Sequence, residues 1–199
     1  MRLRTLFLQL TFLICSSFVG SAQKAEPVAV QVYFSPKDQI AQKLIALIEK
    51  EQKSIHVAIY CLTHRGIAEA LIQAKKRGVE VEMIVDPFSV KTRFPLGRIA
   101  RSGIPVFVWD PGVTGQRKKA PLMHDKFCIF GAKGVWSGSF NFTYDADQAN
   151  RENALFFVDD EAAKRYLEQF RSMKYKGCRP YEEYLTAHNK SSEKVKKRK

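Results

Sequence analysis

Short apolar segments alternate with amphipathic segments along most of this chain, and this alternation restricts its possible folds more than any other feature. The apolar segments carry hydrophobic residues at nearly every position, as in 55-IHVAIYC-61, which is typical of strands buried on both faces of a sheet. The amphipathic segments repeat hydrophobic residues at helical spacing. We therefore expect an α/β fold in which a mixed, largely parallel β-sheet lies between helices. The expected strands are 28–34, 55–61, 79–86, 104–110 and 153–158, and the expected helices are 39–52, 65–77, a short one that ends at Gly103 and a last one that ends near residue 170.

The segment 123-MHDKFCIFGAKGVWSGSFNFT-143 reads as two short strands joined by a glycine-rich turn. Residues i and i+2 of a strand point to the same face, so His124 and Lys126 are expected side by side. Ser139 and Asn141 form a similar pair on the returning strand, and pairing of the strands would bring all four near one anion. This set of groups suits a phosphate that passes through five-coordination. A structural explanation stays open, in which the histidine is an ordinary polar residue and the serine belongs to a turn.

The order His124-x-Lys126 and then Gly138-Ser139-Phe140-Asn141 resembles the H-x-K-x4-D…G-S-x-N signature of the phospholipase D superfamily. The chain resembles in particular the small, exported bacterial endonucleases of that superfamily that carry one copy of the signature. The likeness extends from about residue 30 to residue 170, and it includes 55–63, 71–86 and 151–158. The resemblance implies the phospholipase D-like fold and a phosphodiesterase.

The resemblance also assigns a role to each residue of the signature. It implies that His124 is the nucleophile. It implies that Lys126, Ser139 and Asn141 bind the phosphate. The downstream acid of the family falls on Glu152, and it would hydrogen-bond the histidine ring and fix its tautomer.

One position departs from the signature, because Gly131 stands where the family has an aspartate seven residues after the histidine. An extended strand would place this position about 23 Å from His124 and on the opposite face of the sheet. We infer that the aspartate serves the architecture and that its loss is compatible with catalysis. An inactive protein stays an alternative.

In-line displacement at phosphorus needs one group that attacks and another that protonates the leaving oxygen on the opposite side. The chain has four histidines, of which only His124 belongs to the signature. His56 lies inside an apolar strand, His64 could face the site or belong to a helix cap, and His188 precedes the C-terminal tail. We therefore expect a homodimer that brings two copies of His124 to one phosphodiester, as the resemblance also implies. Lysine charge replaces a metal in this scheme, so we expect neither a metal nor another cofactor.

The formal net charge of +13 predicts a polyanionic partner, either nucleic acid or an anionic membrane. Basic residues and aromatic residues mix in the connecting segments, which favours single-stranded DNA or RNA. A lipid phosphodiesterase and a catalytically silent nucleic-acid-binding protein of the cell envelope are the alternatives. The expected nucleic-acid groove comprises Arg65, Lys91, Arg93, Arg117, Lys118, Lys119 and Phe142. Four further aromatic residues lie among or beside these segments: Phe88, Phe94, Trp109 and Tyr144. Of these, Trp109 is more plausibly a core residue.

The N-terminal residues 1–22 combine two arginines, an apolar run and small residues before Gln23, which is the pattern of a signal peptide. An uncleaved membrane anchor is the alternative. We expect an exported protein, in the periplasm or associated with the envelope membrane, whose nuclease domain spans 23–188 and whose basic tail, 189–199, is disordered. Export permits one disulfide among Cys61, Cys128 and Cys178, the cysteines that follow the signal peptide. Cys128 is expected in a buried strand, so Cys61–Cys178 is the pair to test. Unpaired, buried cysteines are equally compatible with the sequence.

Overall fold

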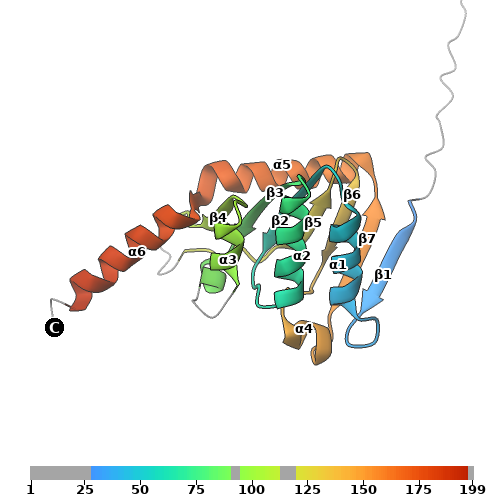
Figure 1. Cartoon of the computed structure of the whole chain (residues 1–199), viewed down its shortest axis with the longest axis horizontal. Helices are drawn as coiled ribbons and strands as arrows, with labels where there is room; N and C mark the ends of the chain where they lie inside the picture. The colour runs from blue at the N-terminus through green and yellow to red at the C-terminus, as the bar shows by residue number, and fades with distance from the viewer. Residues whose placement is uncertain (1–27, 91–94, 113–119, 197–199) are drawn as a thin grey trace, which may run out of the picture.

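The strands of the described chain form one sheet, in the order β1-β7-β6-β5-β2-β3-β4-β8 (Figure 1). The computed structural model describes residues 28–90, 95–112 and 120–196, with the backbone alone for 189–196. The strands are β1 (Val30–Phe34), β2 (Ser54–Ile59), β3 (Glu80–Val85), β4 (Val106–Trp109), β5 (Lys126–Phe130), β6 (Gly134–Gly138), β7 (Asn153–Val158) and β8 (Cys178–Pro180). The helices are α1 (Ile40–Lys50), α2 (Arg65–Lys76), α3 (Leu96–Arg101), α4 (Tyr144–Gln148), α5 (Asp160–Gly177) and α6 (Tyr181–Lys196), with a 3-10 helix, η1, at Pro87–Val90.

The sheet is mixed, as expected, but the expectation that it is largely parallel is wrong. Only the pairs β2–β3 and β3–β4 are parallel, and the other five neighbouring pairs are antiparallel. Parallel neighbours need a crossover, which α2 and α3 supply between these three strands. Strands β5 and β6 instead join through a tight turn and form the expected hairpin.

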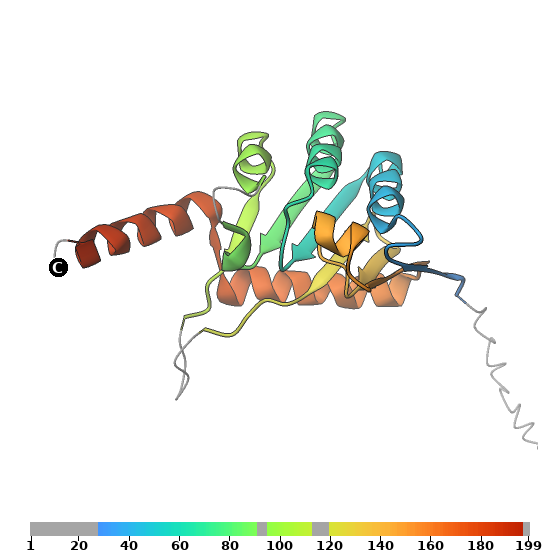
Figure 2. The ribbon, with the colours of Figure 1, turned by 90° about the horizontal axis from the view of Figure 1, so that it is seen from below.

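The two faces of the sheet carry different numbers of helices. Helices α1, α2 and α3 lie along one face, whereas α5 crosses the opposite face (Figure 2). The hydrophobic core between α1–α3 and the sheet includes Leu44, Ile48 and Leu71, all fully buried. A smaller core lies under α5 and includes Phe127 and Phe170.

The sequence pattern explains why α1 packs against the sheet. Ile40, Leu44 and Ile48 recur at intervals of four residues and are completely buried, so they form one apolar stripe on the helix. Burial of each such side chain stabilises the fold by about 1.5–3 kcal/mol.

The C-terminal part differs from the expectation. Helix α5 continues to Gly177, β8 then pairs with β4, and α6 extends away from the domain (Figure 1). The sequence predicts a disordered tail, whereas in the structure the backbone of 189–196 continues α6; residues 197–199 lie outside the described residues. The tail follows an amphipathic start at Tyr181, and its lysine-rich composition still permits a helix.

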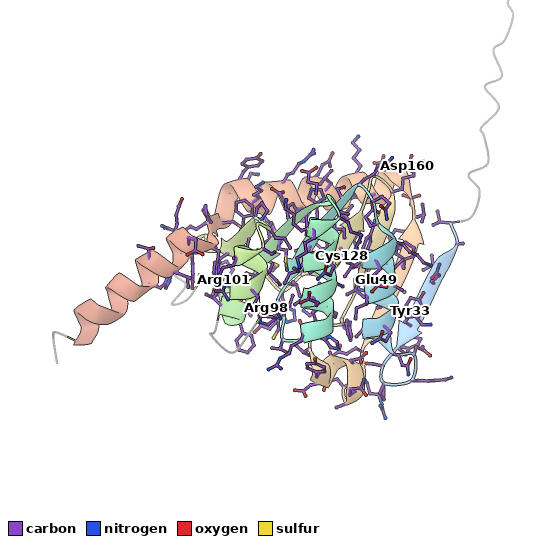
Figure 3. All side chains as sticks on the ribbon, viewed as in Figure 1. Tyr33, Glu49, Arg98, Arg101, Cys128 and Asp160 are labelled. Carbon is purple, nitrogen blue, oxygen red and sulfur yellow. The ribbon has the colours of Figure 1, made fainter. Side chains whose placement is uncertain are left out.

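The predicted Cys61–Cys178 disulfide is wrong, since Cys178 is a thiol in this structure. Cys61 follows β2 and Cys178 lies in β8, and β3 and β4 separate these two strands. Three strand spacings amount to about 14 Å, whereas a disulfide needs Cα atoms within about 7 Å. Cys128 is fully buried in β5, as expected (Figure 3).

The predicted signal peptide, residues 1–22, lies outside the described residues. Among the helices that the structure describes, none is long and apolar enough to span a bilayer.

Candidate active site

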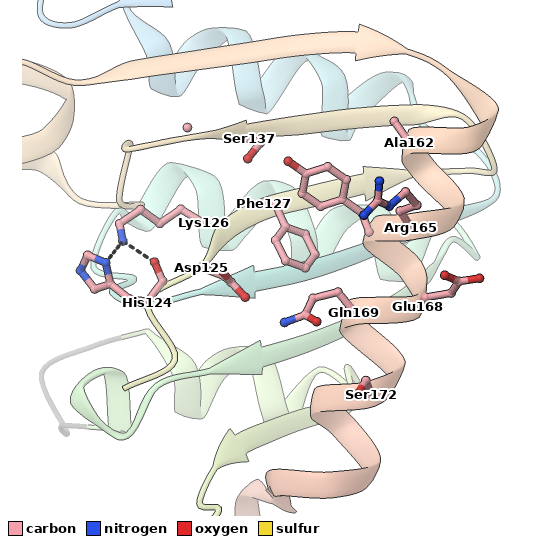
Figure 4. A pocket seen from close by; sticks show the side chains of 12 residues that line it. His124, Asp125, Lys126, Phe127, Ser137, Ala162, Arg165, Glu168, Gln169 and Ser172 are labelled. Carbon is pink, nitrogen blue, oxygen red and sulfur yellow. Dashed lines mark hydrogen bonds between the residues drawn. The ribbon is translucent and has the colours of Figure 1, made fainter. Parts of the chain in front are cut away.

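His124 and Lys126 lie side by side where the chain enters β5 (Figure 4). Nζ of Lys126 lies 3.1 Å from Nδ1 of His124 and donates a hydrogen bond of 2.7 Å to the His124 carbonyl oxygen. The Lys126 side chain is buried, whereas His124 is exposed. The predicted pairing of the two side chains is confirmed, although β5 begins at Lys126 and His124 precedes it.

The surroundings of the Lys126 ammonium group favour the binding of an anion. Burial lowers the pKa of the Lys126 ammonium, and the nearby acidic groups, Asp125, Glu152 and Cys61, oppose this shift. Nζ also lies 5.3 Å from the centre of the Tyr60 ring, a position that favours a cation. A partly desolvated ammonium that already has a fixed direction is a strong partner for a phosphate oxygen.

The loop after β6 carries Ser139 and Asn141, and its conformation depends on Gly138. A Cβ atom at Gly138 would lie 2.2 Å from the carbonyl oxygen of Asn153 and 2.9 Å from Cα of Ala154. Only glycine fits this close approach of β6 to β7. The backbone N–H of Ser139 then donates to the Asn153 carbonyl at 3.0 Å, which fixes the start of the loop.

Glu152 binds Ser139 and not the imidazole. Ser139 Oγ donates a hydrogen bond of 2.5 Å to Glu152 Oε2, and Asn150 Nδ2 donates one of 3.1 Å to Oε1. Among the described residues no hydrogen bond joins the His124 ring to Glu152: Nδ1 of the ring lies beside Lys126, and the Glu152 oxygens accept from Ser139 and Asn150. This corrects the expectation for a single chain.

Asn141 holds an unsatisfied polar atom beside the site. Its Oδ1 is buried and has no hydrogen-bond partner among the described residues. A buried polar atom without a partner costs about 1–3 kcal/mol. Only a group that donates a hydrogen bond would remove this cost, whereas the predicted phosphate role of Asn141 would use Nδ2 as the donor.

Two phenylalanines of the same loop are anchors. Phe140 and Phe142 are almost completely buried, and Phe142 forms a β-bridge with Leu62. The prediction that Phe142 lines a nucleic-acid groove is therefore wrong, because a side chain that is 0 % exposed presents no face to a base. The apolar F-x-F spacing indicates an anchored loop and could have shown this.

Asp86 was missed by the sequence analysis, although it supports the site. This carboxylate is 2 % exposed and follows β3. Its Oδ2 accepts the backbone N–H of Met123 at 3.0 Å, and its Oδ1 accepts the N–H of Phe88 at 2.8 Å. The carboxylate thus ties the segment that carries His124 to the end of β3. An aspartate directly after an apolar strand was the available signal.

A cavity of about 750 Å³ opens beside His124 and Lys126 and extends between the sheet and α5 (Figure 4). Its floor includes Phe127 of β5 and Ser137 of β6, and its far wall is the side of α5 that carries Arg165 and Gln169. The His124 end is polar and open to solvent, so a phosphodiester can reach the imidazole there.

The other three histidines have structural contacts. His64 caps α2, with Nδ1 accepting the N–H of Ile67 at 3.3 Å, which settles the alternatives left open for it. His56 packs edge-on against Phe170 of α5. His188 stacks on Tyr184 in α6. Of the histidines, His124 alone lines the described cavity.

The predicted groove residues are distributed unevenly. Arg65 is exposed at the start of α2, and Arg98 forms an exposed ion pair with Glu69 at 2.8 Å (Figure 3). Trp109 is half-buried, with Nε1 donating to the Pro121 carbonyl at 2.8 Å, as suits a structural residue. Lys91, Arg93, Phe94, Arg117, Lys118 and Lys119 lie outside the described residues.

Gly131 lies in the turn at the far end of β5 from His124. Its φ of +57° is left-handed, and a Cβ there would lie 3.6 Å from the carboxylate oxygens of Glu51. An aspartate would be strained and would face this carboxylate. In this chain the position therefore belongs to the turn.

Within the residues that the structure describes, no group of three or more histidine, cysteine, aspartate or glutamate side chains is arranged to hold a metal ion.

Comparison with known proteins places these residues in a family context. Residues 44–174 match the family model described as "Cardiolipin synthase, PLD-like domain". The chain is 33% identical over 147 residues to a protein named phospholipase D from Rickettsia prowazekii, with 73% of this chain and 67% of the relative covered. It is 27% identical over 134 residues to mitochondrial cardiolipin hydrolase of Xenopus tropicalis, with 67% of this chain and 60% of the relative covered.

Two solved structures resemble the whole domain. Nuc from Salmonella typhimurium, a phospholipase D family member, has 31% sequence identity and a TM-score of 0.68, with 78% of this chain and 99% of that chain covered. NucT from Helicobacter pylori has 26% identity and a TM-score of 0.71, with 77% and 99% covered. The family match over residues 44–174 includes both strands of the hairpin and the loop that carries Asn141.

Proposed function

Since the chain belongs to the phospholipase D superfamily and is a phosphodiesterase of that superfamily, we propose that it is a metal-independent endonuclease that prefers single-stranded DNA or RNA. The observation that carries the proposal is the pairing of His124 with the buried Lys126 at the open end of one cavity. The similarity over nearly the full length of Nuc supports a phosphodiester substrate of the same class.

The first step is an attack on phosphorus by Nε2 of His124. The P–N bond forms while the bond to the leaving oxygen breaks, and a second imidazole on the opposite side gives its proton to that oxygen. Lys126, Ser139 and Asn141 bind the non-bridging oxygens, whose negative charge increases in the transition state. In the second step the same second imidazole takes a proton from water, the hydroxide attacks phosphorus and the P–N bond breaks. The net change is the addition of one water molecule.

The tautomer of His124 supports a role for a second chain. A protonated Lys126 can only donate to Nδ1, so the ring hydrogen would then lie on Nε2 and block the attack. The attack requires Lys126 to turn to the phosphate and Nδ1 to donate its hydrogen to a carboxylate. Within the described chain the Glu152 carboxylate accepts hydrogen bonds from Ser139 and Asn150 instead. We propose that Glu152 orients His124 of a second copy, across the two-fold axis of a homodimer.

The face of the sheet that carries α5 has room for this second copy. Val30 and Val32 of β1 are 50% and 48% exposed, and Leu155 and Phe157 of β7 beside them are only partly buried. These side chains form a continuous apolar strip, because directly paired residues point to the same face. The cavity on the same face opens at His124. A second copy on this face would cover apolar surface and bring a second His124 to the site.

For the substrate there is an alternative to nucleic acid. A lipid phosphodiesterase is favoured by the names of two relatives, phospholipase D and mitochondrial cardiolipin hydrolase. The net charge of +13 and the likeness to Nuc and NucT favour nucleic acid. A catalytically silent nucleic-acid binder would share the charge and would not need His124.

We also propose that the protein is exported and acts in the periplasm or at the envelope membrane. The basic and apolar pattern of residues 1–22 supports this. Cell fractionation, with the N-terminal sequence of the recovered protein, tests it, and a cytoplasmic protein that retains residue 1 would contradict it.

The decisive experiment counts imidazoles. Wild-type residues 23–199 should cleave single-stranded DNA in the presence of a chelator, and His124→Ala should not, with His188→Ala as the control that retains activity. When wild-type and His124→Ala chains are unfolded and refolded together, activity should fall with the square of the wild-type fraction, because each site needs two imidazoles. A linear fall would contradict the shared site, and a chelator-sensitive enzyme would contradict the metal-independent mechanism.

A further inference from the structure

Two aromatic rings form a shelf next to the catalytic pair, and the proposed steps make no use of its outer member. The rings of Tyr60 and Phe88 are parallel, with centroids 5.4 Å apart and an interplanar angle of 2°. The Tyr60 ring is in turn 4.6 Å from the ring of His124 and 5.3 Å from Nζ of Lys126. Phe88 is therefore two ring contacts away from the reacting imidazole.

Buried hydrogen bonds hold this shelf in place. Asp86 accepts the backbone N–H of Phe88 with one oxygen and the N–H of Met123, next to His124, with the other. Ser89, which is 0 % exposed, donates from Oγ to the Tyr60 carbonyl oxygen at 2.9 Å. The shelf and the catalytic segment are thus fixed to each other through Asp86, so a group bound on the shelf has a defined distance from the phosphorus.

Phe88 is a large apolar side chain that is nevertheless 38% exposed, beside the Tyr60 ring that contacts His124. Stacking of a nucleic-acid base on an exposed aromatic ring contributes to single-strand binding and requires no particular base. We propose that the Tyr60–Phe88 shelf is the stacking site for the base next to the scissile phosphate, with Phe88 contacting the base. This inference rests on the proposed nuclease function and narrows its substrate to strands whose bases are unpaired.

The shelf has a consequence for substrate class. A base in a duplex is already stacked between its neighbours, so only an unpaired base can stack on Phe88 without the cost of leaving the duplex. A glycerophospholipid has no aromatic ring at the position next to its phosphate and gains nothing from the shelf. The shelf therefore favours single-stranded nucleic acid over both duplex nucleic acid and a glycerophospholipid.

The test compares strands with and without bases. The substrates are one single-stranded oligonucleotide and its abasic counterpart, which keeps the phosphates and lacks every base. Phe88→Leu keeps the apolar character and removes the ring, and it should lower kcat/KM for the normal strand about 10-fold and leave the abasic strand unchanged. Phe88→Trp should retain the preference for the normal strand. Tyr144→Leu is the matched control, since Tyr144 is also an exposed aromatic residue but stacks on His64.

The outcomes separate this inference from the function on which it rests. If the wild-type protein cleaves both strands equally well, or if Phe88→Leu weakens both equally, the shelf is not a base site while the nuclease proposal stands. If the wild-type protein cleaves neither strand, both proposals fall. A base-dependent loss confined to Phe88→Leu, absent in Tyr144→Leu, supports the shelf.

Discussion

The two faces of the sheet are covered to different degrees. On the face of α1–α3, side chains such as Leu44 and Leu71 are fully buried and the core is continuous. On the face of α5, Val30 and Val32 are about half exposed and a cavity of about 750 Å³ remains beside the helix. The first face therefore stabilises the single chain, whereas the second leaves apolar surface uncovered. Because its cavity opens at His124, the incompletely covered face is also the one on which we propose that the second copy binds.

The largest expected effect is the loss of the second imidazole from the site. Val32→Lys places a charge in the exposed apolar strip and should convert a two-chain particle into a single chain. Activity should then fall by about 10³-fold, the contribution of one general acid, equivalent to about 4 kcal/mol. Sedimentation equilibrium and cleavage assays at matched concentrations measure both effects.

Gln31→Lys is the matched control for this variant. Gln31 is the neighbouring exposed residue of β1, and its side chain points to the opposite face. It should leave mass and activity unchanged. A Val32→Lys protein that stays a fully active two-chain particle would remove this strip from the interface and would leave the requirement for two imidazoles standing.

A truncation in each face should separate folding from assembly. Leu71→Ala opens a cavity at a fully buried position and should lower the free energy of unfolding by about 3 kcal/mol at any protein concentration. Leu155→Ala, at a partly buried position of β7, should have a smaller effect that increases with protein concentration, since the wild-type side chain is fully covered only in the dimer. Denaturant unfolding at two concentrations tests this, and equal, concentration-independent losses would contradict the comparison.

The ion pairs of the two faces should also differ. Lys174 of α5 pairs with Glu82 of β3 at 2.6 Å, and both side chains are largely buried, at 22% and 19% exposed. Glu82→Gln should therefore cost about 1 kcal/mol, with little dependence on salt. The exposed pair Arg98–Glu69 joins α3 to α2, and Glu69→Gln should change stability too little to measure. Salt-dependent unfolding compares the two, and a larger loss for Glu69→Gln would reverse the expected order.

The sequence predicted the parts of the fold that depend on local patterns. The strand at 153–158 and the helix from residue 65 were found within one residue, because apolar runs and helical spacing are local signals. Strand direction was predicted wrongly, since it depends on how β5, β6, β7 and β1 connect across the sheet. The short strand β8 was missed, because it forms only by pairing with β4.

In the active site, too, the features that depend on local patterns were predicted and those that depend on long-range contacts were not. The i, i+2 rule placed His124 beside Lys126 correctly, since it needs only a strand-like backbone. The contact of Glu152 with Ser139 could not be predicted, because it depends on the distance between two loops. Asp86 was overlooked since its role lies in two backbone N–H groups, and a sequence does not display these.

The smallest expected effect concerns pH and compares one histidine near each face. His56 lies under α5 against Phe170, and its Nδ1 is buried without a hydrogen-bond partner among the described residues. Burial lowers the pKa of His56 below 6.5, with the Arg171 and Lys174 charges acting in the same direction and the Glu82 and Glu80 carboxylates opposing it. Burial likewise lowers the pKa of His64 at the start of α2.

The sign of the effect follows from proton uptake. Below about pH 6.5 the unfolded chain takes up protons at both positions before the folded chain does, so stability falls as the pH falls through 6.5 toward the folded pKa values. His56→Phe keeps a ring against Phe170 and removes one titrating group, so it should make this fall shallower. His64→Asn keeps a cap for α2 and removes the other, and the double variant should be flattest. Unfolding midpoints between pH 5 and 8 measure the slopes, and a His56→Phe slope as steep as that of the wild type would show that the α5 face leaves this imidazole free to charge.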